Sequence, residues 1–279
     1  MPNRSGTIKS MKLYQHVERV ERELQAQGLK DSEPLDPAAL ESLDQLHYHG
    51  RSAVLEAIEH LELKPESRVL DVGSGLGGPA RVIASETGCQ VTAVELQNDL
   101  NHLAASLTQR CGLDGRIEHR RADILTADLP THAFDALVSW LTFLHIPERE
   151  TLLSRCFRRL RPGGRIWVED FFARRALSEE ESGLLANEVF CQRLDSLDDY
   201  RASIEEARFQ DIDFRDMTES WGEFVGSRLE AFREDRSRFA GIHGEAAFLA
   251  LEAFYSVMDR LFSSGALGGL RWSASRPTE

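Results

Sequence analysis

The stretch Val69-Leu70-Asp71-Val72-Gly73-Ser74-Gly75-Leu76-Gly77-Gly78 decides the fold class that we predict for this chain. Three apolar residues and one aspartate at its start predict a short buried strand. The glycines that follow allow the backbone to turn sharply, and they allow a ligand to approach where a Cβ atom would collide. Val82 and Ile83 then indicate a helix. The stretch therefore predicts a strand, a Gly-rich turn and a helix, an arrangement typical of ligand-binding α/β proteins.

Strands and helices alternate along the middle of the chain. We predict strands over 68–72, 91–94, 117–119, 134–139 and 165–169, and helices near 52–63, 99–111 and 151–160 in addition to the one after the Gly-rich turn. The sequence Arg161-Pro162-Gly163-Gly164 is expected to turn into the last of these strands. This rhythm predicts βαβ units on a parallel sheet.

Both flanks are predicted to be mostly helical. We expect helices over 8–28, 38–46, 178–190, 198–207 and most of 221–262, and strands over 210–214 and 270–274. No linker-like composition separates the flanks from the middle. We therefore expect a single domain over 1–279, with an N-terminal helical cover (1–66), a ligand-binding core (67–170), and a helical lid with the final strands (171–279).

Length, composition and charge exclude several classes of protein. The 279 residues suffice for one large α/β domain, and 42% apolar with 28% charged residues is ordinary for a soluble protein. The net charge of −13 argues against binding to nucleic acid or to an anionic membrane surface. No apolar run approaches the roughly 20 residues that span a bilayer.

The cysteines are widely spaced and form no C-x-x-C pair. They are Cys89, Cys111, Cys156 and Cys191. This spacing fits neither a disulfide framework nor a zinc site, so we predict reduced thiols and no metal. Residues 1–12 are polar and basic and lack the apolar core of a signal peptide. We expect a cytoplasmic protein.

Asp71 distinguishes two ligands that the Gly-rich turn could bind. Gly73, Gly75 and Gly78 satisfy G-x-G-x-x-G, and Glu95 follows at a distance suited to a ribose diol, so a dinucleotide is one candidate. A dinucleotide would place its pyrophosphate at this turn, where the Asp71 carboxylate would repel it. S-adenosylmethionine has no phosphate and carries an ammonium and a sulfonium, which a carboxylate attracts. The simpler alternative is that Asp71 only caps the turn.

Five motifs in chain order resemble the class I, Rossmann-like S-adenosylmethionine-dependent methyltransferases. They are the stretch 69–77, Val94-Glu95, Ala122-Asp123-Ile124, Phe134-Asp135-Ala136-Leu137-Val138-Ser139 and Leu160-Arg161-Pro162-Gly163-Gly164. Each motif stands at its expected strand, which makes the set more specific than any one of them. The resemblance implies an α/β fold with a seven-stranded sheet whose last strand is antiparallel.

The resemblance also implies which residues bind S-adenosylmethionine. The implied site consists of Asp71, Gly73, Ser74 and Gly75 at the methionine end, Gly77 where close packing is needed, Glu95 at the two ribose hydroxyls, Leu96 and Gln97 beside ribose and adenine, Asp123 and Ile124 at adenine, and Ser139 at the end of the fourth strand. A bidentate carboxylate suits a vicinal diol. For Glu95 the alternative is a surface ion pair.

Two further segments resemble a narrower group of enzymes. Phe143-Leu144-His145-Ile146 and Asp44-Gln45-Leu46-His47-Tyr48-His49-Gly50 are similar to segments of the sarcosine/dimethylglycine N-methyltransferases and, more distantly, of the phosphoethanolamine methyltransferases. In the latter, a histidine at the position of His145 pairs with an N-terminal tyrosine and assists proton removal. Tyr48 is our candidate for that tyrosine, and Tyr14 is the alternative. Imidazole is a base near neutral pH, which fits an amine acceptor.

The remaining candidates concern the acceptor. We expect it to be contacted by Trp140, His145, Asp170, Phe171, Tyr200 and Trp221, where aromatic rings could hold a methylated ammonium. Dimethylglycine methyltransferases often carry Gln-Asp where this chain has Trp140-Leu141, which leaves the amine undefined. Three alternatives stay open: C- or O-methylation of a lipid or natural product, binding of the cofactor without catalysis, and an NAD-linked oxidoreductase. The sequence does not indicate an oligomeric state.

Overall fold

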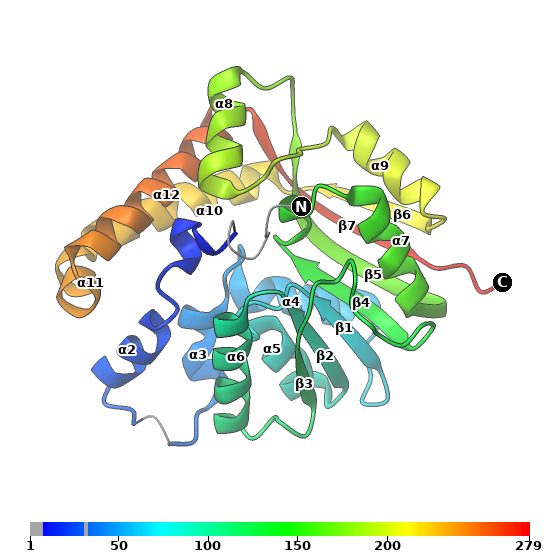
Figure 1. The fold of residues 1–279 in the computed structure, drawn as a ribbon, viewed down its shortest axis with the longest axis horizontal. Helices are drawn as coiled ribbons and strands as arrows, with labels where there is room; N and C mark the ends of the chain where they lie inside the picture. The colour runs from blue at the N-terminus through cyan, green and yellow to red at the C-terminus, as the bar shows by residue number, and fades with distance from the viewer. Residues whose placement is uncertain (1–7, 31–32) are drawn as a thin grey trace.

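The computed structural model describes residues 8–30 and 33–279, and its centre is a seven-stranded sheet (Figure 1). The strands are β1 (Arg68–Val72), β2 (Gln90–Glu95), β3 (Ile117–Arg121), β4 (Phe134–Trp140), β5 (Leu160–Ala173), β6 (Gln210–Asp216) and β7 (Leu267–Ser275). Their order is β3-β2-β1-β4-β5-β7-β6. The first five strands pair in parallel, and β7 is antiparallel to both β5 and β6. The predicted fold class and every predicted strand are confirmed.

Helices cover both faces of the sheet because successive strand residues point to opposite sides. On one face Leu70 and Val72 of β1 pack with α7 (Arg149–Arg159) and α9 (Leu197–Glu206). On the other face Val69 packs with α4 (Gly50–Leu61) and α5 (Gly78–Thr87). The helix α6 (Asn98–Arg110) follows β2 and contacts β2 and β3. Because helices cover both faces of the sheet, a ligand can reach it only at the ends of the strands.

The terminal parts of the chain gather beyond the carboxyl ends of the strands (Figure 1). They comprise a short 3-10 turn η1 (Lys12–Tyr14), α2 (Arg19–Ala26), α3 (Pro37–Asp44), α8 (Glu179–Leu184), a π-helical turn η3 (Leu185–Val189), α10 (Thr218–Glu234), α11 (Arg236–His243) and α12 (Glu245–Ser263). Met11, Tyr48, Trp221 and Phe262 share one apolar cluster in this region. Within the described ranges, no helix is both long enough and apolar enough to cross a membrane.

The prediction of one continuous helix over 8–28 is wrong. The structure has η1 and α2 there, separated by a bend. The apolar residues of this segment serve two different clusters: Met11 packs in the lid, whereas Val20 and Leu24 pack against α3 and α6. A straight helix could not reach both. The Arg19 guanidinium satisfies carbonyls at the bend, donating to Leu13 (2.9 Å) and His16 (3.0 Å).

Two other predictions need smaller corrections. The predicted helix 178–190 ends in the π-helical turn η3, after which Phe190 adopts a left-handed conformation with φ 57°. The predicted turn 161–164 lies inside β5, where the register with β4 shifts and Gly163 has φ 76°. Side-chain periodicity does not report either irregularity, because both depend on how the backbone is paired.

Candidate active site

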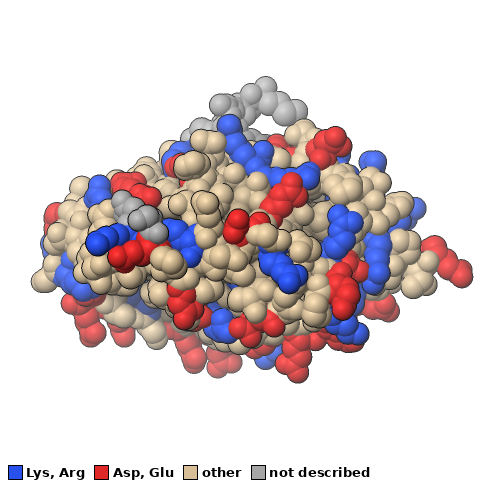
Figure 2. Space-filling model, turned by 90° about the horizontal axis from the view of Figure 1, so that it is seen from below, with Lys and Arg blue, Asp and Glu red and all other residues tan. Residues whose placement is uncertain are grey.

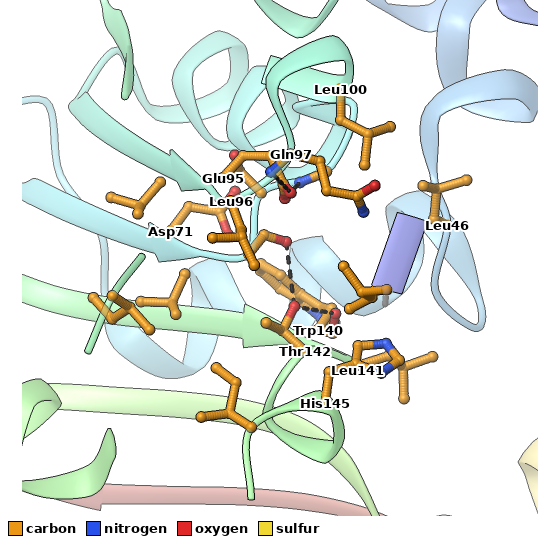
Figure 3. A pocket seen from close by; sticks show the side chains of 18 of the residues that line it. Leu46, Asp71, Glu95, Leu96, Gln97, Leu100, Trp140, Leu141, Thr142 and His145 are labelled. Atoms are coloured by element: carbon orange, nitrogen blue, oxygen red, sulfur yellow. Dashed lines mark hydrogen bonds between the residues drawn. The ribbon is translucent and has the colours of Figure 1, made fainter. Parts of the chain in front are cut away.

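A cavity of about 350 Å³ opens at the carboxyl ends of β1, β2 and β4. Figure 3 shows Asp71, Glu95 and Gln97 on one side of it and Trp140 and His145 on the other. The volume falls in the range of small-molecule and cofactor sites. Its position outside the strand ends is the one that parallel α/β sheets use for ligands.

The Gly-rich turn forms the floor of the cavity in a conformation that side chains would prevent. Gly73 has φ 74°, and a Cβ atom there would lie 2.2 Å from the Thr142 side chain. The N–H groups of Gly73 and Ser74 both donate to the carbonyl of Val94, at 2.8 and 3.0 Å. Gly77 begins α5 with φ 76°, and a Cβ atom there would lie 2.9 Å from His119. The predicted need for glycine in this turn therefore has a steric cause.

Two of the three acidic residues of the predicted cofactor site, Asp71 and Glu95, lie near each other in the cavity wall. Asp71 is 1% exposed, and its Oδ2 has no hydrogen-bond partner among the described residues. Burial, reinforced by the nearby carboxylate of Glu95, raises the pKa of Asp71 to about 8. Glu95 accepts the N–H groups of Gly75 (3.0 Å) and Gln97 (2.8 Å). Burial raises the pKa of Glu95, and these hydrogen bonds oppose the shift.

Cofactor affinity is expected to depend on pH because of Asp71. Below about pH 8 the free protein holds this carboxyl mostly protonated. An ammonium is bound best by the carboxylate, so binding should release a proton. Between about pH 5.5 and 7.5, affinity for S-adenosylhomocysteine should rise with pH by up to about tenfold per unit. Calorimetry in buffers of different ionisation heat would measure the number of protons released on binding. Asp71→Asn should abolish the slope, and a pH-independent Kd in the wild type contradicts this role.

The other predicted cofactor residues are close to this wall, with two exceptions. Leu96, Gln97, Asp123 and Ile124 line the cavity. Gln97 also has a buried Oε1 without a partner among the described residues. The Asp123 Oδ1 accepts the N–H of Leu125 at 2.9 Å and so shapes the loop after β3. Ser139 and Gly77 do not line the cavity.

Ser139 has a structural contact instead. Its hydroxyl is fully buried and donates to the carbonyl of Val72 at 2.8 Å. This bond joins the ends of β4 and β1 beneath the Gly-rich turn.

His145 stands on the opposite wall with its ring held by the backbone. Its Nδ1 lies 3.3 Å from the carbonyl oxygen of Phe190. With Nδ1 donating to that oxygen, the lone pair of Nε2 is available. Burial lowers the pKa of His145 to about 4, and the contact with Phe190 opposes the shift. The imidazole is therefore neutral at physiological pH.

Tyr14, rather than Tyr48, is the tyrosine beside His145. The Tyr14 and His145 rings lie edge to face, with centroids 6.3 Å apart, and both line the cavity. Tyr48 packs among aromatic rings, with centroids 5.1 Å from Trp221 and 5.6 Å from Phe224. These ring contacts make Tyr48 a packing residue. Tyr48 does reach a second, adjoining cavity.

This second cavity, of about 40 Å³, is nearly apolar. It shares Tyr14, Leu46, Leu141 and His145 with the first cavity. The rest of its described lining is Met11, Leu13, Tyr48, Leu144, Phe171, Val189, Val225, Arg228, Phe254, Tyr255 and Met258. Its position next to His145 suits the part of an acceptor that extends away from the cofactor.

The structure separates the candidate acceptor residues. Trp140 lines the main cavity and Phe171 the second. Trp221 is fully buried among aromatic rings. Asp170 and Tyr200 are fully buried and hydrogen-bonded to each other at 2.8 Å, away from both cavities. Direct contact of these last three with an acceptor has no support in the geometry.

Several cavity residues were not singled out from the sequence. They are Asp44, Leu46, Thr142, Glu148, Phe190 and Gln192 in the main cavity, and Arg228 and Tyr255 in the second. Asp44 and Leu46 lie within the segment whose resemblance was noted, which is a signal that could have found them. Phe190 and Arg228 carry no such signal, because only the packing of the lid brings them to the site.

Charge on the surface and at the site agrees with a small-molecule ligand. On the face drawn in Figure 2, acidic and basic side chains are interspersed. Asp44, Asp71, Glu95, Asp123 and Glu148 line the main cavity, which is therefore acidic. Within the described residues, no group of three or more His, Cys, Asp or Glu could hold a metal ion.

Comparison with known proteins gives the class of this chain. Residues 70–168 match the methyltransferase domain family. The chain is 30% identical over 185 residues to a glycine/sarcosine/dimethylglycine N-methyltransferase of Actinopolyspora halophila, which covers 66% of this chain but only 33% of that protein. It is 26% identical over 242 residues to a sarcosine/dimethylglycine N-methyltransferase of Halorhodospira halochloris, covering 87% and 82% of the two chains.

A solved structure supports the same assignment. Phosphoethanolamine N-methyltransferase 2 of Haemonchus contortus, in complex with phosphomonomethylethanolamine and S-adenosylhomocysteine, superposes with a TM-score of 0.74 at 25% identity. The match covers 81% of this chain and 52% of that one. The part of the chain that matches the methyltransferase domain family, residues 70–168, thus forms the centre of a Rossmann-like sheet. Its predicted resemblance to S-adenosylmethionine-dependent methyltransferases, with the N-methyltransferases of glycine derivatives and phosphoethanolamine among its relatives, is confirmed.

Proposed function

We propose that this protein transfers a methyl group from S-adenosylmethionine to the nitrogen of a small amine. The observation that carries the proposal is the buried Asp71 carboxyl, whose Oδ2 is unpartnered among the described residues in a cavity that also holds Glu95 and His145. That donor set fits the cofactor: it offers a carboxyl for the ammonium and a second for the ribose diol, and no Lys or Arg is among the described residues that line the cavity. The names of the relatives agree with an amine acceptor.

The residues have separate tasks in this reaction. When bound, S-adenosylmethionine supplies an electrophilic methyl group, and the acceptor's lone pair forms the new bond while the carbon–sulfur pair returns to sulfur. Asp71 and Glu95 would hold the two ends of the cofactor, and the Gly-rich turn lets it lie close to the backbone. His145, neutral and with Nε2 available, would accept the acceptor's N–H and orient its lone pair. Alignment of this kind can supply roughly 7–11 kcal/mol of the acceleration.

Turnover with a library of amines tests the proposal. Formation of S-adenosylhomocysteine with at least one small amine is the expected result. Binding of the cofactor without turnover on any acceptor would favour a non-catalytic binding protein. Tight binding of NAD without binding of S-adenosylmethionine would favour an oxidoreductase.

One observation favours a second candidate function, C- or O-methylation of a more apolar acceptor. The second cavity is lined mainly by Leu, Val, Met and aromatic side chains. Among its described lining residues, none is a carboxylate that could stabilise a methylated ammonium. Including apolar phenols and carboxylic acids in the acceptor library distinguishes the two chemistries.

We also propose that the acceptor carries an anionic group, and Arg228 supports this proposal. It is the only Lys or Arg among the described residues that line the second cavity. Its guanidinium stacks on Phe224 (4.6 Å) and Tyr255 (5.9 Å), and no ion pair with a carboxylate is found for it among the described residues. A carboxylate or phosphate on the acceptor would supply the missing counter-charge.

Arg228→Gln is therefore expected to raise KM for an anionic acceptor by about tenfold or more. The Kd for S-adenosylhomocysteine should change little. Arg233→Gln is the control, because Arg233 lies on the same helix but pairs with Glu252 at 2.8 Å on the surface. Steady-state kinetics with an anionic acceptor and its methyl ester checks the result, and equal KM changes for both would contradict the role.

We also propose that residues 1–279 form one domain, since β6 and β7 complete the same sheet as β1 to β5. A cytoplasmic location and a lack of affinity for nucleic acid remain proposals that rest on the cysteine spacing and the acidic charge.

A further inference from the structure

A buried cluster of charged side chains lies next to the segment that carries His145. Asp170, near the end of β5, is fully buried. Its Oδ2 accepts hydrogen bonds from the Tyr200 hydroxyl (2.8 Å) and from Arg149 Nη1 (3.2 Å). Its Oδ1 accepts the backbone N–H of Leu144 at 3.0 Å. Asp170 therefore anchors the turn Phe143–His145 at the residue that precedes His145.

Arg149 extends this anchor to the second segment that holds His145. Its guanidinium lies 4.5 Å from the centroid of the Tyr200 ring, and its Nε donates to Asp195 at 3.3 Å. The Asp195 backbone carbonyl accepts the N–H of Ala173 at the end of β5 (2.8 Å). Asp195 lies five residues after Phe190, whose carbonyl oxygen contacts Nδ1 of His145. The segment that carries the His145 ring and the segment that carries its partner Phe190 are thus both connected to the Arg149 guanidinium.

We propose that Asp170 is a positioning residue that, through Arg149, fixes the place of the His145 ring. The inference rests on the proposed function and goes beyond it, because neither Asp170 nor Arg149 lines the described cavities. Buried ion pairs contribute little to stability compared with apolar packing, but they hold their partners in one geometry. A small displacement of a reacting group lowers the reaction rate strongly. The proposed reaction therefore requires the His145 ring to be held in one position.

Asp170→Asn tests the role because it keeps size and can still accept the Leu144 N–H, but it removes the charge that holds Arg149. We expect kcat to fall between about 10- and 100-fold, with the Kd for S-adenosylhomocysteine within about twofold of wild type. In a His145→Ala background, Asp170→Asn should lower kcat by less than about twofold, because the His145 ring through which Asp170 acts is already absent.

Glu23→Gln is the matched control. Glu23 is also a buried carboxylate, paired with Arg238 (2.9 Å) and His243 (2.8 Å), but it joins α2 to α11 and does not line the cavities. It should alter thermal stability without altering kcat. If Asp170→Asn does not fold, Tyr200→Phe is the second variant. It removes the hydroxyl that donates to Asp170 (2.8 Å) and accepts from Arg149 Nη1 (3.3 Å), but it keeps the ring under Arg149. The same kinetic pattern is expected with a smaller loss.

NMR of the histidine ring signals separates failure of this inference from failure of the proposed function. The signals of His145, identified by their loss in His145→Ala, should shift in Asp170→Asn and stay in place in Glu23→Gln, whether or not an acceptor is turned over. Unchanged His145 signals, or an equal loss of kcat with and without His145, would overturn the positioning role. Absence of turnover on every acceptor, with the signals shifted, would overturn the proposed function alone.

Discussion

Replacement of His145 by alanine is expected to lower kcat by about 100-fold, because the acceptor's lone pair loses the hydrogen bond that orients it and misalignment is costly to the rate. The reason is the geometry of the ring. The carbonyl oxygen of Phe190 lies 3.3 Å from Nδ1, which leaves Nε2 available, and His145 lines both cavities. The Kd for S-adenosylhomocysteine, measured by calorimetry, should change by less than about threefold. An equal loss of cofactor binding and turnover would mean that His145 only lines the cavity and does not orient the acceptor.

The pH profile of kcat provides an independent check on His145. Its pKa of about 4 means that the neutral form persists throughout the neutral range. Loss of activity through protonation of this ring should therefore begin only as the pH falls toward about 4. An acid limb near the ordinary histidine value of about 6.5 would contradict an imidazole that stays neutral in this cavity.

Two tyrosine variants refine the same prediction. Tyr14→Phe should lower kcat more than Tyr48→Phe, because Tyr14 lies against the His145 ring in the main cavity while Tyr48 packs among Trp221, Phe171 and Phe224. The reverse order would restore Tyr48 as the partner of His145.

Replacement of Glu95 by alanine is expected to weaken cofactor binding by about 1–3 kcal/mol, or roughly 5- to 150-fold in Kd. Two interactions are lost together. The carboxylate that would accept the ribose hydroxyls disappears, and the N–H groups of Gly75 and Gln97 lose their acceptor. Each carboxylate oxygen has two lone pairs, so holding these amides leaves capacity for a diol.

Two further variants identify the cause of the Glu95 effect. Glu95→Gln keeps one carbonyl oxygen and should lose less affinity than alanine. Glu118→Ala on the neighbouring strand removes an exposed carboxylate paired with Arg120 and should leave the Kd unchanged. Calorimetry with S-adenosylhomocysteine measures all three. Wild-type affinity in Glu95→Ala would mean that the cofactor does not bind at this edge of the sheet.

The cofactor half of the site could be predicted because its residues are local in the sequence. Asp71, the Gly-rich turn and Glu95 each follow or end a strand whose apolar pattern is plain. Since neighbouring parallel strands end at the same edge of a sheet, recognising the strands was enough to bring these residues together. The structure confirms the strands and places the residues around one cavity.

The acceptor half depends on long-range packing that the sequence does not encode in any short motif. Asp170 and Tyr200 are residue types that can bind a methylated ammonium, yet both accept hydrogen bonds from Arg149 inside the protein. Arg228, which carried no motif, reaches the second cavity because α10 packs over the strand ends.

Sequence periodicity alone determined the sheet, its Gly-rich turn and the carboxyls at its edge, because each depends on residues within a few positions of one another. Only the tertiary structure decided which tyrosine lies against His145, where the helix predicted over 8–28 bends, and which charged side chains line the two cavities. Those features depend on contacts between segments that are far apart in the sequence. Which side chains pack together there depends on the shape and burial of the whole lid.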